Sequence, residues 1–238
     1  MQQSRLNAMG DMVSAIAHQW RQPLNALGLI VQDVNDAYEF GEMTKEYVEK
    51  LVKDCMFYIS EMSQTIDDFR NFFKSSKEKV MFDLIQAFEE IDAIIGPKIM
   101  SDKINMRIDY GDGDDDFMVF GYPNEFKQIV INIIRNSQTA IEDRKQQEAF
   151  EGNIDIEISR SAQHVSIVIT DNGGGISESN LSRLFDPYFT TKNDGKSLGI
   201  GLYMAKAIVE TNMGGEIHAK NYKDGLRVTI VLQHGYQG

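Results

Sequence analysis

The sequence SAIAHQWRQPLNAL, residues 14–27, lies inside a long apolar repeat of helical period. Apolar residues recur every three or four positions over residues 6–38, which predicts one long helix that packs along a single stripe. His18 lies beside this stripe, so we expect solvent to reach its imidazole. Pro23 follows five residues later, although a helix interior normally excludes proline, because its ring removes a hydrogen bond and clashes with the preceding turn. The stretch therefore combines an accessible histidine with a local helix defect.

A second apolar repeat of the same period runs over residues 48–73. Gly41 suits the end of the first helix, and Thr44 suits the N-cap of the second. The two repeats predict an antiparallel helical hairpin. One hairpin cannot cover both stripes, so we expect two chains to associate as a dimeric four-helix bundle. The alternative is a monomeric hairpin that packs on the rest of the chain.

The composition limits the classes of partner. The chain has 24 Lys and Arg residues against 36 Asp and Glu residues, and 24 − 36 gives a net charge of −12. Nucleic acids and anionic membranes bind through basic patches, so we expect neither as the main partner. A single cysteine, Cys55, excludes an internal disulfide and fits a reducing cytoplasm. No stretch approaches the roughly 20 apolar residues of a transmembrane helix, and no signal peptide is visible.

The region from residue 78 onward alternates strand and helix patterns. We predict strands near residues 80–84, 104–110, 154–160, 164–170, 216–221 and 226–232. We predict helices from residue 84 to Gly96-Pro97, over residues 123–143, and after the glycines near residue 200. The acidic run at residues 111–116 lacks the full spacing of a calcium-binding loop, so we interpret it as a solvated turn. His164, His218 and His234 lack metal-ligand spacing and are read as ordinary strand residues.

Two amides stand out on the predicted helix 123–143. Asn132 and Asn136 are four residues apart, so they share one face of the helix. Amides on a buried side are costly unless each finds partners. A hydrated Mg²⁺ that carries ATP phosphates would provide them, because this ion prefers oxygen ligands and keeps several waters. Ordinary polar contacts between helices are the alternative.

A glycine-rich turn, DNGGGI, follows the strand at 164–170. Asp171 can accept a hydrogen bond from the exocyclic amine of adenine, and Gly173 and Gly175 allow backbone conformations closed to other residues. The aromatic loop LFDPYFTTK follows at residues 184–192. In GKSLGIGLYMAKAIVE, residues 195–210, a glycine loop opens a helix, whose N-terminus is a natural phosphate site.

Taken in order, these motifs resemble a known family. The histidine followed five residues later by proline resembles the phosphoacceptor box of sensor histidine kinases. Asn132 to Asn136, Asp171 to Gly175, residues 185–192 and Gly199 to Gly201 resemble the N, G1, F and G2 boxes of the GHKL ATPase domain. The FTTK ending resembles the nitrogen-regulation-type subgroup. The resemblance implies an α+β protein, with a dimerisation and phosphotransfer domain at 1–77 and a GHKL α/β sandwich that binds ATP at 78–238.

The resemblance also implies residue roles. His18 would be the phosphoacceptor, and Asn136 would bind Mg²⁺ with support from Asn132. Asp171 would read adenine. The remaining nucleotide-binding positions would be Gly173, Gly175, Phe189, Thr190, Thr191, Lys192, Gly199, Gly201 and Leu202.

The chain departs from the family pattern in four places. Gln19 replaces the acidic residue thought to take the imidazole proton, and an amide cannot act as a base. Gln22 stands where family members often position a water for dephosphorylation of the partner. Ser197 replaces the first glycine of the G2 box, and Thr139 replaces a lysine. The phosphate charge would then be met by other cations: Lys192, Lys196 or Arg135.

The resemblance predicts an ATP-dependent histidine autokinase of a two-component system that passes its phosphoryl group to a response-regulator receiver domain. Phosphatase activity toward that regulator is a further expectation. We expect a homodimer in the cytoplasm, with any membrane link only through an upstream sensor region. One alternative is a non-enzymatic, nucleotide-binding dimeric scaffold, which Gln19 and Ser197 favour. Another is a conformational ATPase of the gyrase type, which would lack a histidine-bearing hairpin.

Overall fold

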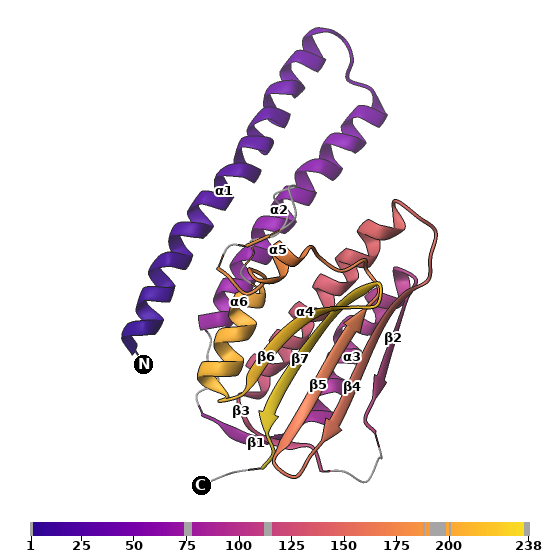
Figure 1. The fold of residues 1–238 in the computed structure, drawn as a ribbon. Helices are drawn as coiled ribbons and strands as arrows, with labels where there is room; N and C mark the ends of the chain where they lie inside the picture. The colour runs from indigo at the N-terminus through magenta and orange to yellow at the C-terminus, as the bar shows by residue number, and fades with distance from the viewer. Residues whose placement is uncertain are drawn as a thin grey trace. The chain divides into compact units, whose positions relative to one another are not determined.

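The computed structural model describes residues 2–73, 78–111, 116–187, 189, 190, 199 and 201–235. Within the first two helices, the side chains of residues 20, 21, 23–60, 62 and 63 are described. These residues form two units, one helical and one α/β, and each is considered by itself (Figure 1). No described helix is both long and apolar enough to cross a membrane.

The helical unit is the predicted antiparallel hairpin. Helix α1 spans Gln2–Glu39 and contains Pro23, and helix α2 spans Lys45–Phe73. Gly41 reverses the chain with a φ of 71°, in the left-handed region that favours glycine. The Thr44 hydroxyl accepts a hydrogen bond from the backbone N–H of Tyr47 at 3.2 Å, which confirms it as the N-cap of α2.

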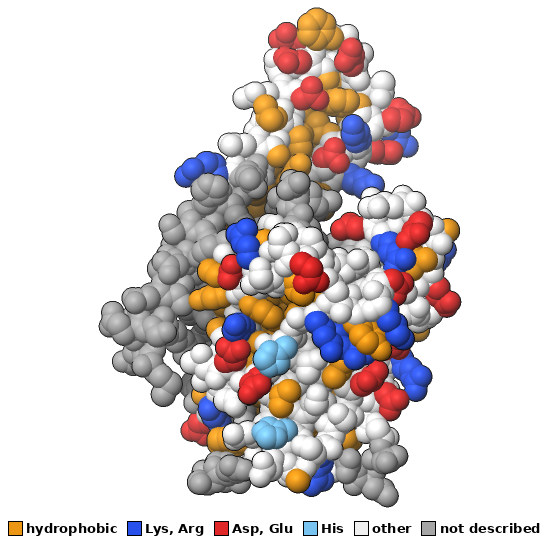
Figure 2. All heavy atoms as spheres, viewed as in Figure 1, with side chains coloured by type: hydrophobic (Ala, Val, Ile, Leu, Met, Phe, Trp, Pro, Cys, Tyr) orange, Lys and Arg blue, Asp and Glu red, His pale blue; other side chains and the backbone are white. Residues whose placement is uncertain are grey.

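One hairpin leaves many of its apolar side chains uncovered. The exposed set comprises Leu24, Leu29, Val31, Tyr38, Phe40, Met43, Val48, Val52, Met56, Phe57 and Ile59. By contrast, Ala37 is the one described hydrophobic side chain of the hairpin that is fully buried. The space-filling view shows such apolar atoms along the hairpin, between charged side chains (Figure 2). The described part of the hairpin thus has apolar faces that it cannot bury alone.

The α/β unit contains two sheets. The strands are β1 (Val80–Asp83), β2 (Ile104–Asp109), β3 (Met118–Gly121), β4 (Gly152–Arg160), β5 (His164–Asp171), β6 (Glu216–Tyr222) and β7 (Gly225–Gln233). The larger sheet is mixed, in the order β2-β4-β5-β7-β6, with β2 parallel to β4 and the other neighbours antiparallel. Strands β1 and β3 pair separately as a two-stranded antiparallel sheet.

Helices cover one face of the larger sheet (Figure 1). They are α3 (Leu84–Ser101), α4 (Pro123–Lys145), α6 (Gly201–Lys206) and its continuation η1 (Ala207–Asn212), with the short α5 (Glu178–Leu181) in the loop after β5. The alternating apolar residues of the strands point toward these helices and are buried: Ile154, Ile156, Ile158, Val165, Ile167, Ile169, Val228, Ile230 and Leu232. The opposite face of the sheet carries charged and polar side chains (Figure 2). This arrangement is the predicted α/β sandwich.

The sequence prediction for α3 was wrong at its C-terminal end. The helix continues through Gly96 and Pro97 to Ser101. A proline removes only one intrahelical bond, and burial of Ile95 and Ile99 in the core holds the last turn in place. Asp102 then caps the helix, and its backbone N–H donates to the carbonyl of Lys98.

Two further features were not predicted. Strand β3 is only four residues long and contains no polar residue, so its sequence shows no alternation of apolar and polar residue types, although burial alternates along it. Residues 207–212 form a π-helix rather than more α-helix. The π-helix carries Asn212 to the start of α4, where its amide donates to the buried carboxylate of Glu125 at 2.9 Å.

Candidate functional site

Helix α4 positions the asparagine pair. Pro123 occupies its first turn, and a stripe of buried residues including Phe126, Ile133 and Ile141 fixes its rotation against the sheet. This rotation leaves Asn132 and Asn136 half-buried. Neither side-chain amide has a hydrogen-bond partner among the described residues. The pair therefore retains oxygen and N–H groups for a ligand.

Asp171 ends strand β5, as predicted, and is buried with 6% of its surface exposed. Its carboxylate accepts hydrogen bonds from the N–H of Gly173 at 2.9 Å and the N–H of Leu226 at 3.2 Å. The Ser137 hydroxyl, one residue after Asn136 on α4, donates to the other oxygen at 2.9 Å. Burial raises the pKa of Asp171, and these three hydrogen bonds act in the opposite direction. The side chain is thus a fixed acceptor at the edge of the core.

The glycines after Asp171 serve different purposes. Gly174 and Gly175 have φ values of 98° and 67°, which supply the reversal of the turn. Gly173 is not in that region, so the prediction of an unusual conformation there was wrong. Glycine is needed at position 173 because there is no room for a side chain. A Cβ on Gly173 would lie 2.7 Å from the Cβ of Ala140 and 2.9 Å from the Ala140 carbonyl carbon. Gly173 therefore lets the turn lie against α4.

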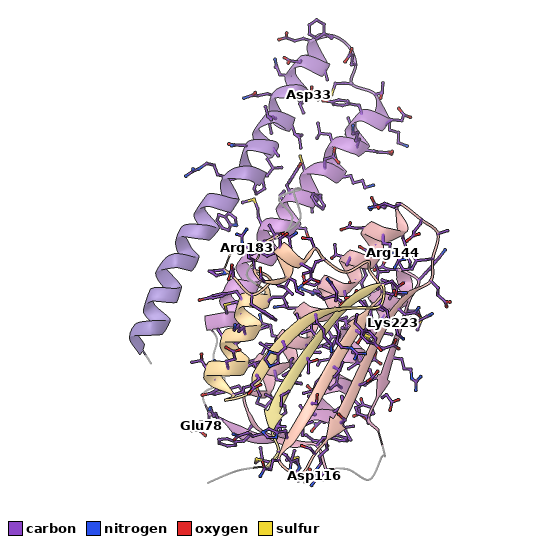
Figure 3. All side chains as sticks on the ribbon, in the orientation of Figure 1. Asp33, Glu78, Asp116, Arg144, Arg183 and Lys223 are labelled. Atoms are coloured by element: carbon purple, nitrogen blue, oxygen red, sulfur yellow. The ribbon has the colours of Figure 1, made fainter. Side chains whose placement is uncertain are left out.

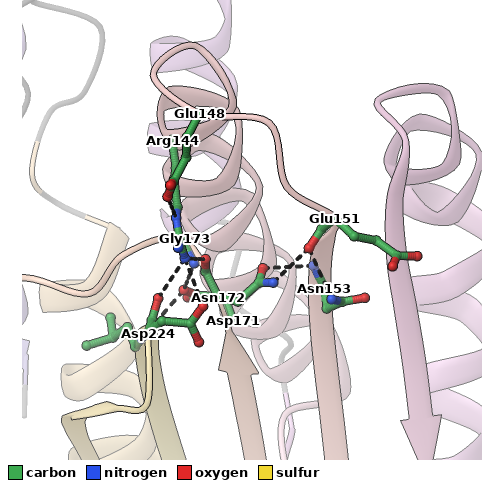
Figure 4. A network of polar contacts seen from close by, with 9 residues as sticks. Arg144, Glu148, Glu151, Asn153, Asp171, Asn172, Gly173 and Asp224 are labelled. Atoms are coloured by element: carbon green, nitrogen blue, oxygen red, sulfur yellow. Dashed lines mark hydrogen bonds and ion pairs between the residues drawn. The ribbon is translucent and has the colours of Figure 1, made fainter.

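Sequence reasoning missed the contacts that Arg144 makes with this turn. Its Nη1 donates to the carbonyl of Asn172 at 2.6 Å and to the Asp224 carboxylate at 3.0 Å, and its Nε donates to Glu148 at 2.5 Å (Figure 4). Asn172 is also held from the other side, where its amide donates to the Glu151 carbonyl at 2.8 Å. Arg144 and Lys223 lie at the same end of the α/β unit (Figure 3). Arg144 lies two helical turns beyond Asn136, and no motif distinguishes it from other helix-surface cations.

The turn between β6 and β7 also supports the site without any motif. Lys223 has a φ of 53°, and the Asp224 carbonyl accepts from the N–H of Gly174 at 2.7 Å. A Cβ on Gly225 would overlap the backbone of Asp171. The hairpin turn and the glycine turn are therefore packed backbone to backbone.

The segments after the glycine turn are described in part. Phe185 and Leu202 pack against the core, and the ring of Phe189 lies under the Arg183 guanidinium at 4.8 Å. Thr190 is exposed and has a partner elsewhere in the chain. Gly199 has a φ of 62°.

Gly201 lies beside the asparagine pair. A Cβ added to Gly201 would lie 3.9 Å from both the Cβ and the Nδ2 of Asn132, the nearest atoms among the described residues. The structure therefore brings the start of α6 close to Asn132 on helix α4.

Several predicted residues lie outside the described parts of the chain. Thr191 and Lys192 are two of them, together with Lys196 and Ser197. His18, Gln19 and Gln22 lie on helix α1, and both glutamines come within about one turn before Pro23, but the side chains of all three are outside the described residues. Their roles stay predictions.

The described residues offer no carboxylate or histidine cluster for a metal. No group of three or more His, Cys, Asp or Glu side chains among them could hold an ion. Residues 112–115 of the acidic run lie outside the described parts, while Asp116 accepts a hydrogen bond from the N–H of Met118 at 3.0 Å, as in a turn.

A known family of ATPases matches the part of the chain that contains this site. Residues 121–235, which contain α4, the glycine turn and the β6–β7 hairpin, match the family described as "Histidine kinase-, DNA gyrase B-, and HSP90-like ATPase". These residues are thus similar to the ATPase domains of that family. The asparagine pair, Asp171 and the glycine turn all lie within the matched ATPase domain.

The similarity extends beyond the ATPase domain. The two-component sensor PprA of Pseudomonas aeruginosa is 26% identical over 232 residues, covering 97% of this chain and 25% of PprA. Sporulation kinase B of Bacillus subtilis is 26% identical over 233 residues, covering 96% of this chain and 50% of that kinase. The chain is homologous to sensor histidine kinases, and it spans about a quarter to a half of the length of these two relatives.

Solved structures share the fold. The histidine kinase ThkA, in its complex with the response regulator protein TrrA, has a TM-score of 0.70 at 21% identity, covering 99% of this chain and 64% of that chain. The Acinetobacter baumannii histidine kinase AdeS has a TM-score of 0.67 at 20% identity, covering 92% of this chain and 98% of that chain. At these identities the likeness concerns the fold, and it includes both the hairpin and the ATPase domain.

Proposed function

We propose that the chain is an ATP-dependent histidine autokinase of a two-component system. The observation that carries the proposal is the buried Asp171 carboxylate near two α4 amides that have no partner among the described residues, in a chain whose first helix bears His18. A hairpin with a histidine five residues before a proline has no role in a plain ATPase. Residues 1–77 would form the dimerisation and phosphotransfer domain, and residues 78–238 the ATP-binding domain.

The adenine end of ATP would bind at the glycine turn. Asp171 would accept a hydrogen bond from the exocyclic amine, since its carboxylate is held in place by three donors. Gly173 and Gly175 would let the base approach the backbone closely. A buried carboxylate that loses this partner is costly, so the site would favour a base that carries a donor at that position.

The phosphate end would lie toward the start of α6. Asn136 would be the Mg²⁺ ligand, supported by Asn132, with the other ligands from phosphates and water. Their lack of partners among the described residues and the open space beside Gly201 fit this role. Bound Mg²⁺ supplies neutralisation of the phosphate charge. Further contacts would come from the segment comprising Phe189, Thr190, Thr191, Lys192, Gly199 and Leu202.

In the transfer step, an imidazole nitrogen of His18 would attack the γ-phosphorus of ATP. The bond from that phosphorus to the β–γ bridging oxygen would break, and ADP would leave with the electron pair. The imidazole proton must then depart, and Gln19 cannot accept it because an amide is not a base at neutral pH. We assign the proton to water. Catalysis would rest on positioning and on charge neutralisation.

The phosphoryl group would pass from His18 to an aspartate of a response-regulator receiver domain. Structural likeness to ThkA, which was solved with the response regulator TrrA, supports this class of partner. Gln22 would position a water that hydrolyses the phosphoaspartate of that regulator, releasing inorganic phosphate and the free aspartate. We place this exchange in the cytoplasm, where ATP is available, and we propose no nucleic-acid partner for a chain of net charge −12.

Two chains would pair through their hairpins. The support is the set of exposed apolar side chains on α1 and α2, for example Leu29 at 67% and Val52 at 52% exposure. Burial of such side chains in a four-helix bundle would stabilise it by roughly 1.5–3 kcal/mol for each one fully buried. Sedimentation equilibrium should give twice the chain mass, and a monomer at micromolar concentration would contradict the bundle.

The autokinase proposal is tested with Mg-ATP labelled at the γ-phosphate. The wild-type chain should acquire an acid-labile phosphoryl group, and His18→Ala and Asn136→Ala should abolish it. His164→Ala is the matched control, because His164 is an exposed histidine at the far end of β5 from Asp171, and it should label like wild type.

The outcomes separate the candidate functions. Undiminished labelling of His18→Ala would refute the assignment of the phosphoacceptor. Normal ATP binding without any labelling would favour the non-enzymatic scaffold. Steady ATP hydrolysis without phosphohistidine would favour a conformational ATPase.

A further inference from the structure

We propose that Arg144 is a positioning residue that gives the nucleotide site its preference for adenine, acting through the turn of β6 and β7. It would not touch the nucleotide. Instead it would hold two backbone segments, the one after Asp171 and the one at Asp224, in the positions that aim the Asp171 carboxylate. The inference rests on the proposed binding of adenine by Asp171.

The geometry shows one guanidinium joined to both segments. Nη1 of Arg144 donates to the carbonyl of Asn172 at 2.6 Å, to the carbonyl of Asp224 at 3.2 Å and to the Asp224 carboxylate at 3.0 Å (Figure 4). Nε donates to the Glu148 carboxylate at 2.5 Å on the following turn of chain. A planar guanidinium serves such divergent acceptors, whereas a lysine ammonium is a point charge on a flexible stem.

The surroundings of Arg144 hold the side chain in this pose. The guanidinium lies over the ring of Phe150 at 4.4 Å, and the side chain is 23% exposed, against 59% for Asp224. The hydrogen bond from Arg144 lowers the pKa of Asp224, and hydrogen bonds to Glu148 and Asp224 raise the pKa of Arg144. Both groups therefore stay charged at neutral pH, and the contact is a charge-assisted one.

The two segments that Arg144 joins also carry donors to Asp171. Asn172 leads into Gly173, whose N–H donates to the carboxylate at 2.9 Å. Asp224 precedes Gly225 and Leu226, and the Leu226 N–H donates to the same oxygen at 3.2 Å. Without Arg144, the side-chain contacts of Asp224 to the turn are lost, while the bonds from Gly174 N–H to the Asp224 carbonyl, from Leu226 N–H to Asp171 and between Asn221 and Ile176 remain. The Asp171 carboxylate would then be held less rigidly while the phosphate-binding residues stayed in place.

The test compares ADP with inosine diphosphate, which lacks the exocyclic amine. The whole chain is used, and the Kd of each nucleotide is measured by titration calorimetry. In wild type, ADP should bind at least about tenfold more tightly. Arg144→Met, which keeps the apolar stem over Phe150, should weaken ADP about tenfold and inosine diphosphate less than about twofold, as expected for the loss of one well-placed hydrogen bond. The ratio of the two affinities in Arg144→Lys should lie between the ratios of wild type and Arg144→Met.

The ratio of the two affinities separates positioning from a merely structural role. A variant that only unfolds part of the protein lowers both affinities by the same factor, because it changes the concentration of competent sites. Arg107→Met is the matched control: it removes the same charge from an exposed ion pair with Asp109 on β2, and the ratio should stay at the wild-type value.

A double-mutant cycle tests the route through Asp224. Asp224→Asn should reduce the ratio of the two affinities. The Arg144→Met, Asp224→Asn double variant should have the same ratio as Arg144→Met alone, since both substitutions remove the same contact. Additive losses would overturn the proposed route. A wild-type preference for ADP that survives in Arg144→Met overturns this inference and leaves the kinase proposal standing. A wild type without adenine preference overturns both this inference and the proposed contact between Asp171 and adenine, and the labelling experiment then decides the kinase proposal separately.

Discussion

The packing of Gly173 against helix α4 leads to a quantitative prediction. In Gly173→Ala, the new Cβ would lie 2.7 Å from the Ala140 Cβ, 2.9 Å from the Ala140 carbonyl carbon and 3.0 Å from the Ile141 backbone nitrogen. Two of these three atoms belong to the backbone of a buried helix, so they cannot move aside as a flexible side chain would. The substitution must therefore push the turn away from α4.

The magnitude follows from opposing contributions. Overpacking of a well-packed site costs about 1–3 kcal/mol. The loss of glycine freedom in the unfolded chain offsets about 0.4–1 kcal/mol. Gly173 does not have a positive φ, so no backbone strain adds to the cost. At the middle of each range, about 2 minus about 0.7, we expect a net loss of about 1.3 kcal/mol. This corresponds to about 2–4 °C of melting temperature for each kcal/mol in a chain of this size.

Scanning calorimetry of the whole chain measures the stability, and titration calorimetry measures the Kd for ADP. Gly173→Ala should lower the melting temperature of the ATPase domain and weaken ADP roughly fivefold, because a displacement that costs the site about 1 kcal/mol has that effect. Adding Ala140→Gly should recover only part of both losses, since it removes the 2.7 Å contact but leaves the two backbone contacts.

Two further variants serve as controls. Gly174→Ala meets nothing closer than the Arg144 Cδ at 3.9 Å, but it has a φ of 98°, so its cost should come from the backbone alone and should not respond to Ala140→Gly. Gly28→Ala in α1 meets no atom within 4 Å in the described part of the chain and should be neutral or stabilising. If Gly173→Ala kept both the wild-type melting temperature and the wild-type Kd, the packing argument would be refuted.

Three other predictions concern ionisable and polar groups. Burial raises the pKa of Asp171 above its ordinary value of 3.8, so ionising this carboxyl costs the folded protein stability as the pH rises past 3.8. The stability of Asp171→Asn relative to wild type should therefore increase from about pH 4 toward neutrality, while ADP affinity is lost. A pH-independent difference in melting temperature would contradict this. The Tyr47 hydroxyl donates to Asp33 at 2.7 Å, which raises the pKa of Tyr47 to about 12, so the stability from this contact should be present below pH 10 and vanish as the pH rises through 12; ultraviolet titration should show the high pKa in wild type and not in Asp33→Asn. Asn212→Ala leaves the buried Glu125 carboxylate without its donor and should cost about 1–3 kcal/mol, read as a lower melting temperature, and an unchanged temperature would show that water replaces the amide.

The sequence by itself predicted the elements whose signals are local. The three- and four-residue apolar spacing indicated the hairpin of α1 and α2, and the capping residue Thr44 indicated the start of α2. The alternation before Asp171 indicated strand β5 and its end. Asn132 and Asn136 could be paired because residues four apart always share a helix face. In each case the information lies within a few residues.

The tertiary structure decided what depends on contacts between distant residues. Helix α3 passes through Pro97 because Ile99 is buried by the core, which outweighs the local helix-breaking signal. The π-helix at 207–212 brings Asn212 to Glu125, 87 positions apart in sequence. The need for Gly173 comes from the backbone of α4, and the contact between Arg144 and Asp224 joins residues 80 positions apart. Periodicity and motif spacing record which way a side chain faces along its own element, whereas close packing and charge pairing depend on which elements the fold brings together.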